Sequence, residues 1–410
     1  MNFFDFLSDP ILAISKWLSE LLIGWGVSAE WSNFILYFIG AALLGTSALL
    51  LTLIFIWAER KIIARLQDRY GPNQVGPWGI FQSVADMVKI FIKEHIIPYG
   101  VDPVPYHLAP IIIVASVLLV WAIIPFSNSL TETNLNVAVI FLLAVGGIGE
   151  LGIMMAGWGS NNKYALISAF RASAQMISYE IPMAIVLLIP VLLSSSMAMD
   201  DIVNAQNMPF ILIMPFAALI FFIASIAENG RAPFDLAEAE SELVAGFNIE
   251  YSGLKFGMFY VADFLRAFTS ALIFSTIFLG GWRGPGVETF PVLGGLYLAI
   301  KSIFIWFLGV WIRGSFPRYR IDQMMNINWK FLTPVSLALF MLVILFGKLF
   351  ENYGQNIQYL SILVINLVLF FISIKLINRK EENLEIPEIG LRSRPVAKPD
   401  NFFSKDISRG

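Results

Sequence analysis

Runs of about eighteen or more apolar residues recur along this chain, and they constrain its fold more than any other feature. A helix rises about 1.5 Å per residue, so about twenty residues cross a bilayer core of about 30 Å. With 57% hydrophobic residues and a mean hydropathy of +0.73, the chain is too apolar for a soluble domain. The sequence therefore predicts an all-α polytopic membrane protein with about nine transmembrane helices. We expect these helices at residues 34–57, 108–126, 137–157, 180–197, 209–227, 256–281, 294–313, 331–349 and 359–377.

The composition excludes several kinds of site. The chain has no cysteine, which excludes disulfides and thiolate-held zinc or iron–sulfur clusters. His95 and His107 are its two histidines, which argues against a histidine-held haem or metal site. A formal net charge of −3 argues against nucleic-acid binding. We therefore expect no metal site, and any redox cofactor must be diffusible or bound by another chain.

The lysines and arginines divide the chain between the two sides of a membrane. Most of the 27 lie in or beside the loops 58–107, 158–179, 228–255 and 314–330 and in the C-terminal tail. Positive charge marks the cytoplasmic side, so we expect these loops and the C-terminus there, or on the matrix side in a mitochondrion. The predicted organisation is an N-terminal interfacial helix in 1–33, a helix bundle in 34–377, and a polar cytoplasmic tail in 378–410.

The first of these loops contains an amphipathic pattern and a basic cluster. Apolar residues at helical spacing, among them Phe81, Val84 and Val88, predict a helix on the membrane surface. Before it, Arg60 and Arg69 follow the first apolar run, and a GPNQVGP turn comes next. Two interpretations remain: positive charge that only sets topology, or a shaped surface for docking.

Carboxylates occur within the apolar runs, where a charge costs on the order of 3 kcal/mol. Glu150 lies inside the third run, Glu180 opens the fourth, and Asp263 lies in the sixth. Asp263 and Arg266 are three residues apart, which favours a structural ion pair. Glu150 and Glu180 have no such local partner, so proton handling is as good an interpretation as a structural role.

The stretch ENGRAPFDLAEAESE, residues 228–242, concentrates negative charge between two apolar runs. Its Asn-Gly-Arg-Ala-Pro sequence ends a helix after Glu228, and a helix could resume at Pro233. That helix would place Asp235, Glu238 and Glu242 on one face and Glu240 nearly opposite. Clustered carboxylates titrate together, as a proton relay requires, but a solvated acidic face is the alternative.

Four segments together resemble one family. Residues 58–94, 170–182, 228–253 and 317–334 are similar to the loops of the H subunit of proton-translocating NADH–quinone oxidoreductase, the counterpart of mitochondrial NADH dehydrogenase subunit 1 in respiratory complex I. The resemblance runs from about residue 34 to 350. It implies a membrane subunit without catalytic residues of its own, which helps to form the quinone cavity and links quinone reduction to proton translocation.

The resemblance also implies partners and site residues. The partners would be peripheral-arm subunits carrying FMN and iron–sulfur clusters, small membrane subunits and antiporter-like subunits, in a bacterial inner membrane or a mitochondrial inner membrane. The positions expected to line the quinone cavity are Arg60, Arg69, Asp86, Arg231, Phe234, Asp235, Arg318 and Arg320. The carboxylates expected on the proton path are Glu150, Glu180, Glu228, Asp235, Glu238, Glu240, Glu242, Glu250 and Asp263. Asp263 departs from the family pattern, which usually has glutamate there.

Three other functions stay open on the sequence. One is the homologous subunit of a membrane-bound hydrogenase or ferredoxin-linked complex, in which quinone is absent. Another is a free-standing ion transporter, although long patterned loops on one side and no inverted repeat argue against it. A purely structural membrane anchor would explain the topology but not the carboxylates within the apolar runs.

Overall fold

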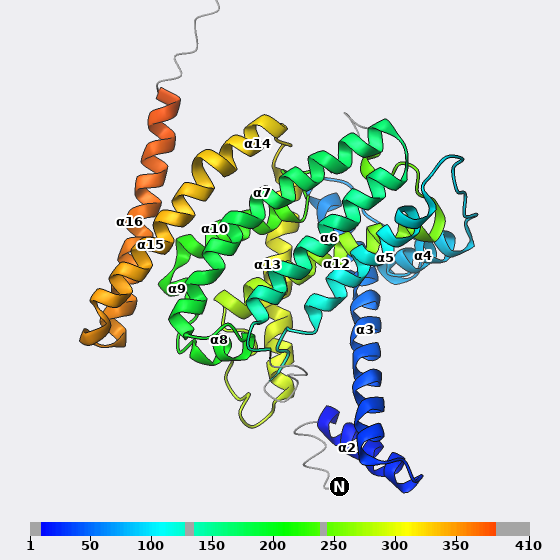
Figure 1. The fold of residues 1–410 in the computed structure, drawn as a ribbon, viewed down its shortest axis with the longest axis horizontal. Coiled ribbons are helices and arrows are strands. Elements are labelled where there is room, and N and C mark those ends of the chain that lie inside the picture. Colours follow the sequence, from blue (N-terminus) through cyan, green and yellow to red (C-terminus); the bar gives the residue numbers. More distant parts are fainter. Residues whose placement is uncertain (1–9, 128–134, 238–243, 383–410) are drawn as a thin grey trace, which may run out of the picture. The chain divides into compact units, whose positions relative to one another are not determined.

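A computed structural model describes residues 10–127, 135–237 and 244–382, and within these ranges the chain forms helices and no strand. The contacts divide the chain into two parts, Met1–Leu369 and Phe370–Gly410. The first part contains the helix bundle, and of the second the structure describes the last turns of one helix (Figure 1). Of the expected polar tail, 383–410 lies outside the described residues.

The long helices confirm the predicted fold class. Within the described residues, eight helices are long and apolar enough to span a membrane. Their bounds, with α14 and α15 forming one continuous span, are α3 Ala29–Leu66, α5 Pro103–Trp121, α6 Ala138–Gly159, α7 Lys163–Ser194, α12 Gly253–Phe278, α13 Val292–Ser315, α14 Ile321–Ile327 with α15 Thr333–Leu349, and α16 Gln355–Glu382. A π-helical turn, Asn328–Leu332, joins α14 to α15.

The expected span 209–227 is interrupted. The structure has a short helix, α9 Phe210–Ile213, followed by the apolar α10 Pro215–Glu228 of 14 residues. Met214 lies between them with φ −133° and ψ 63°, outside the helical region. Proline disfavours helical geometry in the residue before it, so Pro215 accounts for the break.

Two expected loops are largely helical. α3 continues to Leu66, so Arg60 lies on a helix rather than in a loop. α7 begins at Lys163, which places Glu180 in the middle of a 32-residue helix instead of at its start. Both corrections have one cause: these helices extend past their apolar runs, and hydropathy locates the apolar run only.

Short helices complete the described part of the chain. They are α2 Pro10–Gly24, α4 Gln82–Ile92 and α8 Met199–Ala205, with single turns at Pro77–Gly79, Gly246–Asn248 and Glu351–Tyr353. α4 confirms the amphipathic helix predicted in the first loop. α2, at 15 residues, is shorter than a membrane span, and its place at the membrane interface stays a prediction. No helix resumes at Pro233: residues 231–237 form turns, in which Phe234 N–H donates to Arg231 O.

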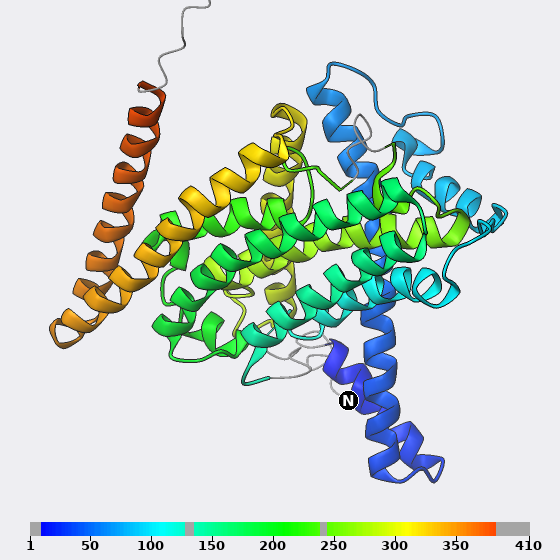
Figure 2. The ribbon, with the colours of Figure 1, turned by 45° about the horizontal axis from the view of Figure 1, so that its top comes forward.

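The centre of the bundle is built from α5, α6, α7, α10 and α12. α6 packs between α5 and α7, and α12 contacts α5, α10, α13 and α3 (Figures 1 and 2). Glycines on α6 permit close approach: a Cβ on Gly157 would lie 2.3 Å from Ala169 Cβ, and one on Gly152 would lie 2.4 Å from Ile113. This close packing brings the membrane-embedded acids of α6 and α7 near each other.

Candidate functional site: an apolar cavity and a file of buried charges

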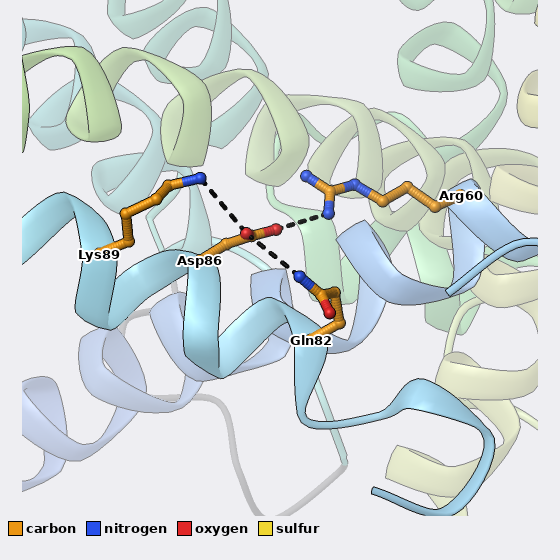
Figure 3. Close-up of polar contacts among 4 residues, drawn as sticks. All are labelled: Arg60, Gln82, Asp86 and Lys89. Carbon is orange, nitrogen blue, oxygen red and sulfur yellow. Dashed lines mark hydrogen bonds and ion pairs between the residues drawn. The ribbon is translucent and has the colours of Figure 1, made fainter. Parts of the chain in front are cut away.

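A cavity of about 930 Å³ lies between α3, α4 and the first turns of α12. Apolar side chains line most of it, including Leu49, Leu53 and Phe91. Its polar lining includes Arg60 of α3 and Asp86 of α4, which face each other (Figure 3). A space of this size with a few polar groups is typical of a small-molecule site.

Asp86 is the centre of the polar contacts in this cavity (Figure 3). Its Oδ2 accepts a 2.6 Å hydrogen bond from Arg60 Nη1, and Lys89 Nζ and Gln82 Nε2 both lie 3.4 Å from Oδ1. Burial alone would raise the pKa of Asp86, but the hydrogen bonds and charges of Arg60 and Lys89 outweigh it and lower that pKa. Asp86 is therefore a carboxylate at neutral pH, and it orients Arg60.

A second cluster surrounds Glu59, the residue before Arg60. The Glu59 side chain is 3% exposed and accepts hydrogen bonds from Arg231 Nη1, at 2.5 Å, and from Arg313 Nη1. The charges of Arg231, Arg266 and Arg313 act on Asp263, which lies nearby on α12. The cluster joins α3, the 228–237 segment, α12 and the end of α13. Glu59 and Arg313 are absent from the sequence-based site.

The 228–237 segment is fixed by contacts on both sides. Asp235 Oδ2 accepts a 2.8 Å hydrogen bond from Arg318 Nη2, so these two predicted residues meet. Phe234 is 6% exposed, and its ring packs between those of Tyr179 and Tyr319. Its burial gives Phe234 an anchoring role, in addition to any contact with a ligand.

Three small cavities lie among the buried charged and polar residues. The first, about 30 Å³, is lined in part by Asp263, Arg266 and Glu228. The second, about 60 Å³, is lined in part by Arg266, Glu228 and Glu180, so two of these residues border both cavities. A third, about 40 Å³, shares Asn229 with the first. A water molecule needs about 10–15 Å³ of such space, so all three have room for water.

The acids around the second cavity are close to one another. A Cβ on Gly146 would lie 3.7 Å from Glu228 Oε1 and 3.9 Å from Glu180 Oε1. The charges of both acids and of Arg266 act on Glu150, which is 7% exposed on α6. Asp263, Glu228, Glu180 and Glu150 therefore form a file of carboxylates, with Arg266 beside it.

The Asp263–Arg266 pair predicted from their spacing is not a direct ion pair within the described residues. Arg266 instead points toward α6, where a Cβ on Gly149 would lie 2.9 Å from its Nη2. The missing side chain of Gly149 makes room for the guanidinium. Arg266 thus lies among the glutamates rather than neutralising Asp263 alone.

The structure does not bring every predicted residue to these clusters. Arg69 Nε donates to Gln67 Oε1, in the turn after α3. Arg320 N–H donates to Gln323 Oε1 at the start of α14. Glu250 Oε1 accepts a 2.6 Å hydrogen bond from Asn162 Nδ2, at the start of α7. The predicted acids that lie outside the described residues are Glu238, Glu240 and Glu242.

Comparison with known proteins identifies the family. The model of the NADH dehydrogenase family matches residues 39–344. The H subunit of NADH-quinone oxidoreductase from Dehalococcoides mccartyi (strain CBDB1) is 46% identical over 286 residues, which cover 70% of this chain and 80% of the relative. The protein of the same name from Geobacillus sp. (strain WCH70) is 44% identical over 324 residues, 78% of this chain and 97% of the relative.

The chain belongs to this family. A third relative, the H subunit of NADH-quinone oxidoreductase from Rhodospirillum centenum, is 43% identical over 288 residues, 69% of this chain and 85% of the relative. The family assignment agrees with the predicted resemblance, and it makes this chain a membrane subunit of a multi-subunit oxidoreductase. Within the described ranges, no group of three histidine or acidic side chains is placed to hold a metal ion.

Proposed function

We propose that this chain forms one wall of the quinone-binding cavity of an NADH–quinone oxidoreductase and links quinone reduction to proton translocation. The observation that carries the proposal is the apolar cavity of about 930 Å³ with the Arg60–Asp86 pair at its polar part. A quinone has a long apolar tail and two carbonyl oxygens. The apolar lining suits the tail, and a guanidinium held by Asp86 is a suitable hydrogen-bond donor to a carbonyl.

The chain would contribute binding and proton pathways rather than electrons. Reduction of a quinone to a quinol takes up two electrons and two protons. The electrons would come from partner subunits carrying FMN and iron–sulfur clusters. In a low-dielectric site, the charge that forms on the quinone acts strongly on nearby ionisable side chains. The proposed response is a change in protonation along Asp263, Glu228, Glu180 and Glu150, which leads toward antiporter-like membrane subunits.

The proposed location is a bacterial inner membrane. The relatives named above are bacterial, and the distribution of lysine and arginine favours a cytoplasmic C-terminus. In that orientation, the cavity beside α4 faces the cytoplasmic side, where a peripheral arm would dock. Arg231, Asp235 and Arg318 would then lie at the boundary between the two arms.

The cavity is tested by Asp86→Asn, with Glu94→Gln as the matched control. Both variants remove one carboxylate from the same amphipathic segment, but Asp86 lines the cavity and Glu94 is exposed. We expect Asp86→Asn to raise the KM for a short-chain quinone about tenfold, because Arg60 is no longer oriented. This factor corresponds to about 1.4 kcal/mol of lost binding free energy. An unchanged KM in membranes with normally assembled complex would contradict the assignment.

The proton path is tested by Glu180→Gln, with the exposed Glu30→Gln as control. Proton uptake into inverted vesicles is measured together with the rate of quinone reduction. We expect Glu180→Gln to lower the number of protons translocated per quinone reduced, whereas Glu30→Gln leaves this ratio unchanged. Normal coupling in an assembled Glu180→Gln complex would remove Glu180 from the path.

A further inference from the structure

Pro182 removes one backbone hydrogen bond from the middle of α7. In an α-helix the N–H of each residue donates to the carbonyl four residues earlier, and proline has no N–H. The carbonyl of Ser178 therefore has no helical donor. Ser178 is 5% exposed, and a buried carbonyl without a partner costs free energy. Glu180 lies midway between Ser178 and Pro182.

The missing donor is replaced from another helix. Asn328 Nδ2 donates to Ser178 O at 2.5 Å, and Asn328 is fully buried. Asn328 is the first residue of the π-helical turn between α14 and α15. The neighbouring residue of α7 is held by the same segment, since Tyr179 OH donates to Met324 O at 3.0 Å. Two successive residues just before Glu180 are thus bonded to α14 and to the π-helical turn that follows it.

We infer that Asn328 is a positioning residue for Glu180, replacing the hydrogen bond that Pro182 removes and so fixing the direction in which Glu180 points. This inference rests on the proposed function, in which Glu180 carries protons. Glu180 lines the 60 Å³ cavity that it shares with Glu228. A small rotation of α7 at the proline would turn the carboxylate away from that cavity. Single π-helical turns are frequent at functional sites, where they place a side chain that a regular helix would not.

The bond between Asn328 and Ser178 also connects the 316–332 segment to the part of α7 that carries Glu180. Arg318 lies on this segment and bonds Asp235, and Tyr319 N–H donates to Pro233 O. Asn328 lies ten residues after Arg318, across the short helix α14. These contacts connect Arg318 to the backbone beside Glu180 through α14 and Asn328.

A second proline shows the same replacement and provides a control. Pro110 in α5 leaves the carbonyl of Tyr106 without its helical donor, and Tyr251 OH donates to that carbonyl at 3.2 Å. Tyr251→Phe removes this bond while keeping the ring. It measures what the loss of one such bond does at a place that does not hold Glu180. Because Tyr251 lines the 930 Å³ cavity, its effect is compared in the proton ratio and not in the rate of quinone reduction.

The test is a double-mutant cycle in the intact, membrane-embedded complex. Asn328→Leu keeps the branched shape and removes the donor, and Asn328→Ala removes both. Each is made alone and together with Pro182→Ala, which restores a backbone N–H at position 182 that can donate to Ser178 O. The measurements are the protons translocated per quinone reduced, the pH profile of that ratio, and the amount of assembled complex.

We expect Asn328→Leu and Asn328→Ala to shift the equilibrium between the cavity-facing and turned-away orientations of Glu180 about two- to tenfold, the factor for one lost hydrogen bond. The proton ratio should fall, and its pH profile should shift. In the Pro182→Ala background, we expect the same substitutions to have little effect. Any effect of Tyr251→Phe should be the same with and without Pro182→Ala, because Tyr251 bonds the carbonyl of Tyr106 and not that of Ser178. Wild-type coupling in assembled Asn328→Leu complex would overturn the inference. So would a loss of coupling that Pro182→Ala does not relieve, whether or not the single variants assemble.

The design separates this inference from the proposed function. If Glu180→Gln leaves coupling normal, the proposed role of Glu180 fails, and the inference fails with it. If Glu180→Gln lowers coupling but Asn328→Leu does not, the proposed function stands and the positioning role alone is wrong.

Discussion

Replacement of Glu59 by glutamine tests the buried charge cluster most directly. Glutamine keeps the shape and the acceptor oxygen of Glu59 but removes the negative charge shared by Arg231 and Arg313. The side chains of Arg231 and Arg313 are 10% and 31% exposed. We expect Arg231 to account for most of the loss, because water solvates Arg313 in part.

The expected loss of stability follows from the burial of the ion pair and from the negative charge that remains in the variant. Removing one partner of a buried ion pair typically costs about 3–5 kcal/mol. Asp263 still attracts both arginines in the variant, so part of that cost is offset. We expect Glu59→Gln to destabilise the fold by about 2–3 kcal/mol. At about 2 cal/mol/K of unfolding entropy per residue, that lowers the Tm of a 410-residue chain by about 3 °C.

The assay is thermal inactivation of the purified complex, with Glu30→Gln as a surface control. A second variant, Arg313→Gln, is combined with Glu59→Gln. Because the double variant removes the excess positive charge, it should be less destabilised than the sum of the single variants, by about 0.5–3 kcal/mol. If the two effects simply add, or if Glu59→Gln is as stable as the control, then Glu59 does not hold these arginines.

Two further predictions come from the geometry. Gly149→Ala places a Cβ 2.9 Å from Arg266 Nη2 and from Ser116 Oγ, so it should displace the guanidinium and lower the number of protons translocated per quinone reduced. The control is Gly147→Ala, whose Cβ meets nothing within 4 Å and should leave this ratio unchanged. Asp86 has a lowered pKa, so its contribution to stability is complete above its unfolded pKa of about 3.9 and is lost as the pH falls through the lower folded value. The thermal stability of the complex should therefore decline below about pH 4 by a component that Asp86→Asn removes, and an unchanged acid dependence in that variant would contradict the ion pair.

The fold class was predictable because hydropathy and helix length both report the membrane. The errors concern helix ends and interruptions. α7 was predicted to begin near Glu180, but it begins at Lys163, since polar residues continue a helix as readily as apolar ones once it has started. The break before Pro215 had a local signal, the proline itself, which the apolar run concealed.

The site was predictable only where contacts are local or the charge is unusual. The acids within apolar runs were recognised from their surroundings, and the structure places Glu150, Glu180 and Glu228 together. Glu59 was missed because its partners lie 172 and 254 residues away in the sequence. One signal was present: an acid directly before Arg60, at the end of an apolar run where basic residues are the rule.

The end of α3 explains how the cavity and the acids can influence each other. Arg60 and Glu59 are consecutive, about 3.8 Å apart at their Cα atoms, yet Arg60 bonds Asp86 in the apolar cavity and Glu59 bonds Arg231 beside Asp263. A unit charge that forms in the cavity about 10 Å from this cluster changes its energy by about 1.7 kcal/mol at an effective dielectric constant of about 20. That energy exceeds the 1.4 kcal/mol or so of one pKa unit. Under the proposed function, a charge on the quinone would therefore favour proton uptake at the start of the file without any large movement of the helices.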